Sequence, residues 1–542
     1  MSEQQTFTTA GSDATLLDAL VVGAGISGIY QLYRLRELGL DVQLLEAGTG
    51  VGGVWFWNRY PGARFDAESY TYGYFFSKEL IEEWDWSEEY AGQPEIERYL
   101  NYAVDRFDLR GLINLEQRVS SAVWDATDRR WTVTTDSGRV WRARYVVTAL
   151  GILSAPAFPK IPGLEDFRGE WAHTGLWPAE GVDFKNKRVA VIGTGSSGVQ
   201  IIPIIAGEAE SLVVLQRRPN WCTPINNFDI TPERMLDIRN RIDEIFEATQ
   251  LSPSGSPHRP MMESSLDLDP DERRKRFEKL YDSPGLVMAL GNFRDVAVNQ
   301  EANDNCTAYI AERIRARVND PAVADRLIPT DHGFGQKRPP LENGYYEVFN
   351  EPHVSLISTM EEEMVRFTET GIQTSEGHYE FDLIVFATGF DAVVGSYNRI
   401  DIRGENGLSL REHWEAGPRT LFGMQTAGFP NLFMIGGAQS VTGTIPRITD
   451  FQADWVASTI EYADEHGYAT ISTTESAEDE WIDHVNSTIV GTLQQTAESW
   501  AFGSNVPGRK RAYLLYAGGL PQYRERVRAA TAAGYQGLQF SS

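Results

Sequence analysis

A glycine-rich turn of the form GxGxxG occurs twice in this chain, each time between a short apolar run and a helix-like stretch. The first is Gly23-Ala24-Gly25-Ile26-Ser27-Gly28, between residues 17–22 and 29–38. The second is Gly193-Thr194-Gly195-Ser196-Ser197-Gly198, between residues 188–192 and 199–206. In such a strand–turn–helix unit the glycines permit the tight turn, the approach of a pyrophosphate and close helix packing. The sequence therefore predicts an α/β fold with two Rossmann-like dinucleotide-binding domains.

The residue that ends the next strand indicates which nucleotide each turn binds. Residues 41–45 form an expected strand that ends at Glu46, where a carboxylate can accept both ribose hydroxyls and would repel a 2′-phosphate. Residues 211–215 form the corresponding strand of the second unit, and it runs into Arg217 and Arg218. Guanidinium groups bind phosphate through paired hydrogen bonds, although a basic strand end can also simply face solvent. We expect FAD at the first turn and NADPH at the second.

An acidic and a basic dinucleotide site in one chain are typical of an enzyme that passes a hydride from NADPH to a flavin. The chain has only two cysteines, Cys222 and Cys306, with no CxxC or metal-ligand spacing. A redox-active dithiol and a metal site are therefore not expected. Oxygen or an external acceptor is the expected destination of the electrons.

Charge and hydropathy limit the partners. The formal net charge of −27 disfavours nucleic acid and anionic membranes, because both are polyanions. Residues 1–15 are polar and lack the apolar core of a signal peptide, and no apolar run approaches the roughly 18 residues of a membrane span. We expect a cytoplasmic enzyme, monomeric or weakly homo-oligomeric, that acts on a small molecule.

A longer motif stands just before the second turn. Residues 167–178, FRGEWAHTGLWP, fit the pattern FxGxxxHxxxWP, the fingerprint of type I Baeyer–Villiger monooxygenases. Residues 52–62, 334–338 and 387–391 extend the likeness, so that the chain resembles this family, and within it the phenylacetone monooxygenase branch, along nearly its whole length. The resemblance implies insertion of one atom of O₂ beside a ketone carbonyl, which gives an ester or a lactone, while the other atom becomes water.

The resemblance also implies a mechanism. The family holds a peroxide anion at C4a of the reduced flavin, and an arginine stabilises this C4a-peroxyflavin and then the tetrahedral adduct with the ketone. That arginine maps onto Arg338 in the pair Lys337-Arg338, and the aspartate that pairs with it maps onto Asp66. Without the resemblance, two adjacent cations would be read as a surface feature.

Further residues are assigned by the same likeness. Lys337 is expected to assist Arg217 at the 2′-phosphate, and Trp500 to close over NADP, unless it is an ordinary core indole. His173 is expected to be a structural linker and not a general base, because a peroxide anion needs no proton abstraction; with Trp177 it would couple domain movement to catalysis. The remaining expected cofactor contacts are Ser27, Val54, Trp55, Arg64, Tyr72 and Val119.

Two segments resemble the crossings between nucleotide domains in such flavoproteins, residues 149–151 outward and 387–391 on the return. They divide the chain into a discontinuous FAD domain (1–150 and 388–542) and an NADPH domain (151–225 and 327–387). Residues 226–326 carry helical periodicity, as at 270–281 and 311–318, and many charges, which predicts a helical subdomain inserted in the NADPH domain.

The chain departs from the family pattern in places. Val54 and Phe56 replace a threonine and a tyrosine, so one hydrogen bond near the flavin is expected to be missing, and Arg218 replaces a commoner threonine. Arg447 lies in an expected apolar substrate wall, where it would either select acidic substrates or point to solvent. The alternatives to ketone oxygenation are a flavin enzyme that oxygenates nitrogen or sulfur, and a sensor flavoprotein without turnover.

Overall fold

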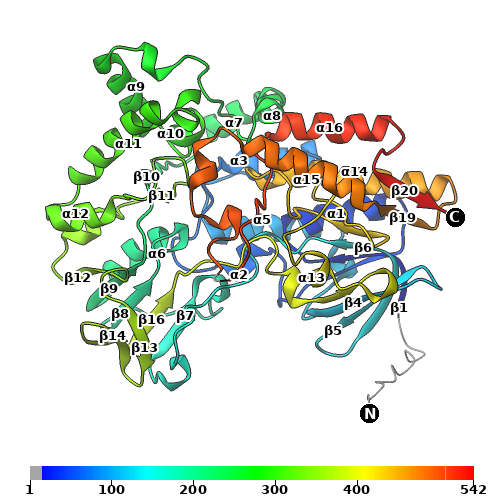
Figure 1. The fold of residues 1–542 in the computed structure, drawn as a ribbon, viewed down its shortest axis with the longest axis horizontal. Helices are drawn as coiled ribbons and strands as arrows, with labels where there is room; N and C mark the ends of the chain where they lie inside the picture. Colours follow the sequence, from blue (N-terminus) through cyan, green and yellow to red (C-terminus); the bar gives the residue numbers. More distant parts are fainter. Residues whose placement is uncertain (1–14, 507) are drawn as a thin grey trace.

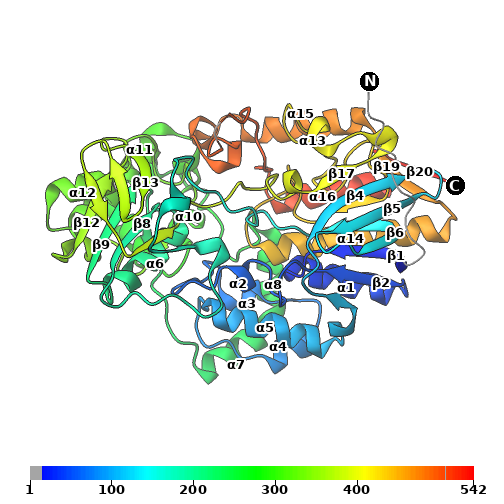
Figure 2. The same cartoon turned by 90° about the horizontal axis from the view of Figure 1, so that it is seen from below.

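The chain folds around two sheets, one in each lobe of an elongated molecule (Figures 1 and 2). The computed structural model describes residues 15–506 and 508–542. The expectation about a signal peptide at the start of the chain falls almost wholly outside these ranges. The mixed α/β architecture with two nucleotide-type sheets confirms the predicted fold class.

The first sheet has eight strands. Its parallel centre consists of β3 (Ile113–Asn114), β2 (Val42–Leu45), β1 (Thr15–Val22), β6 (Val140–Thr148) and β18 (Leu432–Met434). From β6 the sheet continues through antiparallel β5 (Arg130–Thr135) and β4 (Val119–Asp125) to an edge strand, β17 (Asp401–Arg403). The central strands are apolar because helices cover them on both faces; Leu20 and Val21 have no exposed surface.

The second sheet has five parallel strands in the order β12 (Val354–Ser358), β9 (Ser211–Gln216), β8 (Arg188–Ile192), β16 (Leu383–Phe386) and β7 (Glu170–His173). A small antiparallel sheet of β13 (Met364–Thr368), β14 (Gly371–Thr374) and β15 (His378–Glu380) follows β12 in the chain. The chain thus leaves the first sheet after β6, builds the second, and returns to the first at β17 and β18. That is the chain order which two discontinuous domains require.

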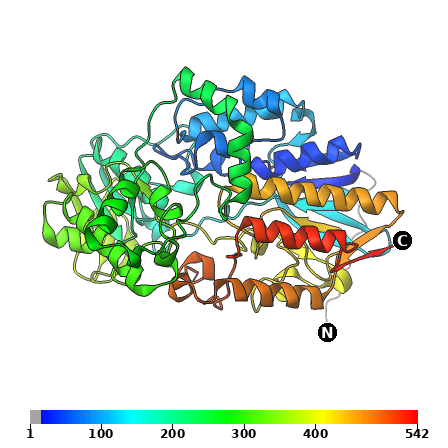
Figure 3. The same cartoon turned by 90° about the horizontal axis from the view of Figure 1, so that it is seen from above.

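Helices pack on both sheets. Beside the first sheet lie α1 (Ile26–Glu37), α5 (Gln93–Arg106), α14 (Ile445–Glu465), α15 (Glu475–Ile489) and α16 (Leu520–Ala532), with short helices α2 (Val54–Trp57), α3 (Ser69–Tyr72), α4 (Lys78–Glu83) and α13 (Leu410–His413). Figure 3 shows α14 between α1 and α16. A two-stranded sheet of β19 (Thr470–Thr473) and β20 (Leu538–Ser541) joins the end of the chain to this lobe, and α6 (Ser196–Ala206) packs on the second sheet.

The residues between β9 and β12 form the helices α7 (Pro232–Asn240), α8 (Ile242–Leu251), α9 (Pro270–Asp282), α10 (Val287–Leu290), α11 (Gln300–Arg315) and α12 (Pro321–Leu327). The helix expected at 270–281 coincides with α9, whereas that expected at 311–318 is only the end of α11, which stops at Arg315. This segment contacts both lobes: α8 packs against α3 and α16, while α9 and α11 share the core of the second sheet (Figure 1). No helix within residues 15–506 and 508–542 is long and apolar enough to cross a membrane.

Candidate active site

The first glycine turn connects β1 to α1 and has the geometry of a pyrophosphate site. Gly23 has φ +106°, and a Cβ atom there would lie 2.5 Å from the carbonyl oxygen of Ala149, at the expected outward crossing. A Cβ atom at Gly28 would lie 1.8 Å from the carbonyl oxygen of Gly23. The helix begins at Gly25 without a capping side chain, so its first N–H groups are available to an anion.

Glu46 lies beside this turn at the end of β2 and is 5% exposed. The N–H of Ala24 donates to its Oε2 at 2.7 Å and the N–H of Gly48 to its Oε1 at 2.7 Å. Val119 is the first residue of β4. Two residues before it, Gln117 donates its backbone N–H to the Glu46 carbonyl at 2.8 Å. The carboxylate is therefore held rigidly, and its acceptor chemistry fits ribose hydroxyls.

The second turn, between β8 and α6, repeats this arrangement. Gly193 has φ +107°, and a Cβ atom there would lie 2.4 Å from the carbonyl oxygen of Ala387, at the expected return crossing. A Cβ atom at Gly198 would lie 2.2 Å from the Gly193 carbonyl oxygen, whereas one at Gly195 would meet no atom within 4 Å. The helix again starts without a capping side chain, with Ser196 exposed and Ser197 half-buried. This open, uncapped end fits a second pyrophosphate.

The cations after β9 lie in a network of charges. Arg217 and Arg218 are exposed, and the Thr194 hydroxyl donates to the Arg218 carbonyl at 3.3 Å. Arg218 pairs through Nη1 with Glu498 at 2.7 Å and with Asp331 at 3.6 Å. Lys337 shares Asp331, at 3.1 Å. Burial opposes the effect, but hydrogen bonds from His332 and Lys337 keep the pKa of Asp331 below its ordinary value.

Glu498 and Asp331 were not predicted. The only signal in the sequence is that both lie close to predicted residues. Glu498 stands two residues before Trp500, and Asp331 stands six residues before Lys337. Both carboxylates neutralise cations that were assigned to a 2′-phosphate. A phosphate that binds here would have to compete with Glu498 for Arg218.

Arg338 and Asp66 come from different parts of the chain and form an ion pair between Nη2 and Oδ2. Asp66 raises the pKa of Arg338, and burial opposes this effect. The arginine side chain nevertheless keeps 45% of its surface exposed, and that of the aspartate 28%. The guanidinium is therefore partly exposed, and a small molecule can reach it.

A group of aromatic side chains lies near this pair, with Tyr72 within reach of both charges. Trp55 donates its indole N–H to the Tyr72 hydroxyl at 3.2 Å, and the ring of Phe65 stacks on that of Tyr72 with centroids 4.8 Å apart. Burial raises the pKa of Tyr72 to about 12, so its hydroxyl stays protonated. Gln93, which was not predicted, donates its side-chain amide to the Trp55 carbonyl.

The short helix α2 carries Trp55 toward the first glycine turn. Val54 is its first residue, and just before it the N–H of Gly52 donates to the Ala24 carbonyl at 2.9 Å. Phe56 lies against glycines, since a Cβ atom at Gly48 or Gly50 would come within 2.6 or 2.7 Å of its ring. Phe56 thus has a packing role.

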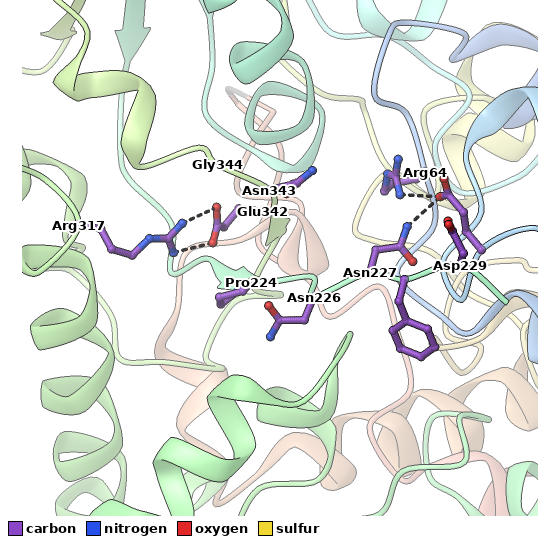
Figure 4. Close-up of a pocket in the computed structure, with 11 residues that line it drawn as sticks. Arg64, Pro224, Asn226, Asn227, Asp229, Arg317, Glu342, Asn343 and Gly344 are labelled. Carbon is purple, nitrogen blue, oxygen red and sulfur yellow. Dashed lines mark hydrogen bonds and ion pairs between the residues drawn. The ribbon is translucent and has the colours of Figure 1, made fainter. Parts of the chain in front are cut away.

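Arg64 has partners in a separate polar cleft of about 510 Å³ (Figure 4). Its Nη1 donates to Glu88 at 3.0 Å and to the Tyr90 carbonyl at 3.2 Å. Asn227 bonds to the same Glu88 carboxylate, and the opposite side of the cleft carries the ion pair of Arg317 with Glu342. Neither glycine turn contributes to the lining of this cleft.

His173 is buried where the two crossings meet. Its Nδ1 accepts the N–H of Gly175 at 2.9 Å, and its Nε2 lies 3.3 Å from both the Ala157 carbonyl oxygen and the Thr388 hydroxyl. Burial lowers its pKa to about 4, so the ring is neutral near pH 7. Trp177, also buried, donates its N–H to the Trp57 carbonyl at 3.3 Å. The His173 ring thus contacts the return crossing and the segment that follows the outward crossing, and the Trp177 backbone contacts α2.

The segment that carries Trp500 is attached to the return crossing. Arg509 pairs with both oxygens of Asp391, at 2.6 and 2.8 Å, and the side chain of Asn505 donates to the Phe390 carbonyl at 2.7 Å. Trp500 itself is half-buried against the core of the first lobe. It therefore lies between this anchor and the Glu498–Arg218 pair.

Arg447 lies in the first turn of α14 and is 1% exposed, so the prediction that it could point to solvent is wrong. Its Nη2 donates to the Gly73 carbonyl at 2.6 Å and lies 3.0 Å from Asp450. Its side chain has no exposed surface, and an enclosed guanidinium cannot meet the acid group of a substrate. Neither partner could be predicted from a local pattern around Arg447.

Comparison with known sequences identifies relatives that span the whole chain. Residues 20–254 match a family model described as pyridine nucleotide-disulphide oxidoreductase. The 2-oxo-Delta(3)-4,5,5-trimethylcyclopentenylacetyl-CoA monooxygenase of Pseudomonas putida is 41% identical, over 97% of this chain and 98% of the relative. A Baeyer–Villiger monooxygenase of Pseudooceanicola batsensis is 39% identical, over 98% and 97%. The phenazine N-monooxygenase PhzNO1 of Lysobacter antibioticus is 40% identical, over 97% and 97%.

A solved structure has the same fold. The crystal structure of OTEMO in complex with FAD and NADP superposes with a TM-score of 0.94 at 41% sequence identity. The match covers 98% of this chain and 100% of the other. Two nucleotides are thus bound by a protein of the same fold and length.

Proposed function

Because the chain belongs to the type I Baeyer–Villiger monooxygenases, we propose that it uses FAD, NADPH and O₂ to convert a ketone into an ester or lactone. The residues fit both cofactors. The uncapped start of α1 and the fixed carboxylate of Glu46 suit the pyrophosphate and ribose of FAD. The open turn at Gly195 and the cations after β9 suit NADPH.

We assign the FAD domain to residues 1–150 and 388–542 and the NADPH domain to 151–225 and 327–387, with 226–326 inserted. The chain path through the two sheets supports this division. Because α8 contacts α3 and α16, part of the inserted segment packs against the FAD domain.

The ion pair of Arg338 with Asp66 carries the proposal. When bound and reduced by NADPH, the flavin supplies the reaction of O₂ that delivers one oxygen atom to the ketone. Negative charge then develops on the carbonyl oxygen, and a fixed guanidinium close by stabilises it. Asp66 holds Arg338 in place and keeps it protonated, because an adjacent carboxylate favours the cation.

Aromatic rings around the pair support the same assignment. Trp55, Phe65 and Tyr72 pack against one another, and the Tyr72 hydroxyl has a raised pKa and is a poor proton donor near pH 7. Apolar rings on one side of the guanidinium strengthen its electrostatic effect, while its exposed part stays accessible to a substrate. The hydrogen bond from Trp55 to Tyr72 fixes both rings.

The substitution Arg338→Ala tests this assignment. Ketone oxygenation is expected to fall by about 100-fold or more, because the charge that faces the developing oxyanion is lost, while NADPH still reduces the bound flavin. Product formation is measured by mass spectrometry and flavin reduction by stopped-flow absorbance. Arg106→Ala is the control and should retain both activities: it breaks an ion pair of similar exposure between Arg106 at the end of α5 and Glu83 at the end of α4. Normal ketone oxygenation by the Arg338 variant would contradict the proposal.

A second candidate is oxygenation of nitrogen or sulfur, which the likeness to the phenazine N-monooxygenase favours. A panel of linear, cyclic and aryl ketones, a sulfide and a phenazine, each with NADPH and O₂, separates the two. Ester or lactone products identify the first function. An N-oxide or sulfoxide without any ester identifies the second.

A further inference from the structure

Arg447 is among the largest side chains without exposed surface in the described part of the chain. Its guanidinium lies over the ring of Phe75, 4.1 Å from the centroid, and donates one hydrogen bond, from Nη2 to the Gly73 carbonyl. Its Nε and Nη1 have no hydrogen-bond partner within the described residues. Burial lowers its pKa, and Asp450 opposes this effect.

A buried ion pair is weak support for stability, because desolvation of both charges offsets their attraction. Asp450 illustrates this cost, since burial raises its pKa to about 6 although Arg447 opposes the shift. Leucine or methionine would fill the same space without the penalty. What these side chains could not supply is the contact of the guanidinium with the Phe75 ring and the hydrogen bond to Gly73, and only the second reaches the backbone beside the candidate active site.

Tyr72 of the candidate active site is the last residue of the short helix α3, and Gly73 follows it directly. The next residue is fixed as well: the Tyr74 hydroxyl donates to the Ile26 carbonyl at 2.6 Å, in the first turn of α1. The Tyr74 N–H donates to the Tyr99 hydroxyl at 2.7 Å. Residues 72–74 are therefore held between the first turn of α1 and the first turn of α14.

Arg447 is itself held firmly. The Nη2 of Arg524, on α16, donates to its carbonyl oxygen at 2.7 Å. Close packing surrounds it, since a Cβ atom at Gly255 would lie 3.0 Å from the Arg447 Cβ. The Thr444 N–H, at the start of α14, donates to the Ser254 carbonyl at 2.8 Å. The backbone and Cβ of Arg447 are therefore fixed, and with them the position from which its side chain reaches Gly73.

We propose that Arg447 is a positioning residue for the oxygenation site, which fixes Tyr72 relative to the first glycine turn through the Gly73 carbonyl. This inference rests on the proposed function for its kinetic consequences. It explains why a cation stands in an otherwise apolar wall. In this proposal Asp450 only compensates the buried charge of Arg447 and has no positioning role of its own.

Three variants separate positioning from charge compensation. Arg447→Met with Asp450→Leu removes both charges and the hydrogen bond to Gly73. Asp450→Asn removes one charge and leaves that hydrogen bond. Arg317→Met breaks a second buried pair, with Glu342, away from the glycine turns and serves as the control for loss of stability alone. Each is purified with FAD bound and compared in thermal unfolding, visible flavin absorbance, and kcat and KM for a ketone.

The double variant is expected to unfold near the wild-type temperature, but with a shifted flavin spectrum and a kcat about 10- to 100-fold lower, because displacement by about 1 Å costs that much. Asp450→Asn and Arg317→Met should keep the wild-type spectrum and a kcat within a few-fold. A wild-type spectrum and kcat in the double variant would overturn the proposal. A tenfold loss of kcat in Asp450→Asn would also overturn the proposal, and this variant can be measured even if the double variant does not fold. If the wild-type protein oxygenates no ketone, the proposed function fails, while the spectra still test the role of Arg447.

Discussion

The ion pair of Asp66 with Arg338 permits a test in which stability and activity should separate. The perturbation is Asp66→Asn, which keeps the size of the side chain and removes its charge. Because the two side chains are 28% and 45% exposed, solvent screens the pair, and its loss should cost no more than about 1 kcal/mol of unfolding free energy. In a chain of this length that corresponds to a fall in Tm of about 2 °C or less.

The effect on the reaction should be larger. In Asp66→Asn the guanidinium of Arg338 loses its charged partner and is held less firmly, and misplacement of a group that faces the reacting atoms costs about 10- to 100-fold in rate. This corresponds to about 1.4–2.7 kcal/mol of activation free energy. KM for NADPH should change little, since Asp66 lies apart from the cations after β9.

The assay combines thermal unfolding with steady-state oxygenation of a ketone by holoenzyme, using Arg106→Ala as the matched exposed pair. Two results would refute the reasoning. One is a rate within twofold of the wild type, which would remove Asp66 from the site. The other is a loss of unfolding free energy above about 3 kcal/mol, which would make the pair a structural element of the kind found in protein interiors.

Two further predictions concern the NADPH site and the crossings. Arg217→Ala and Arg218→Ala should each raise KM for NADPH, by about 10- to 100-fold for Arg217 and by less for Arg218, because Glu498 already neutralises Arg218. KM for NADH should stay unchanged and serves as the reference. An unchanged KM for NADPH in both variants would reject the assignment. His173 has a native pKa of about 4 against an ordinary 6.5, so its contribution to stability is full above pH 6.5 and is lost as the pH falls toward 4. Urea unfolding at pH 7 and pH 5 should show about 2 kcal/mol of this loss in the wild type, absent from His173→Gln; an equal loss in both proteins would show that other groups cause it.

Local sequence patterns predicted the nucleotide-binding units well, because their physical requirements are short-range. A tight turn with φ above +100° needs glycine at positions 23 and 193, and close helix packing needs it at 28 and 198. The expected strand at 188–192 coincides with β8, and that at 211–215 lies within β9. The helix expected at 311–318 was misplaced because periodicity does not fix where a helix ends.

Contacts between distant segments were predicted only where the family resemblance supplied them, as for Asp66 and Arg338. Glu498 beside Arg218, Arg509 beside Asp391 and Gln93 beneath Trp55 had no local signal. Such pairs depend on how the lobes and connecting segments pack, and a single sequence carries no record of which distant side chains meet.

The sequence by itself determined the two glycine turns, the acidic and basic ends of the following strands, and through the fingerprint the family. The tertiary structure decided where Arg447 lies, because its environment is made by Gly73, Arg524 and Gly255, none of them adjacent to it in the chain. The physical reason is that backbone geometry is set by neighbouring residues, whereas burial and pairing of a charge are set by whatever the fold brings around it.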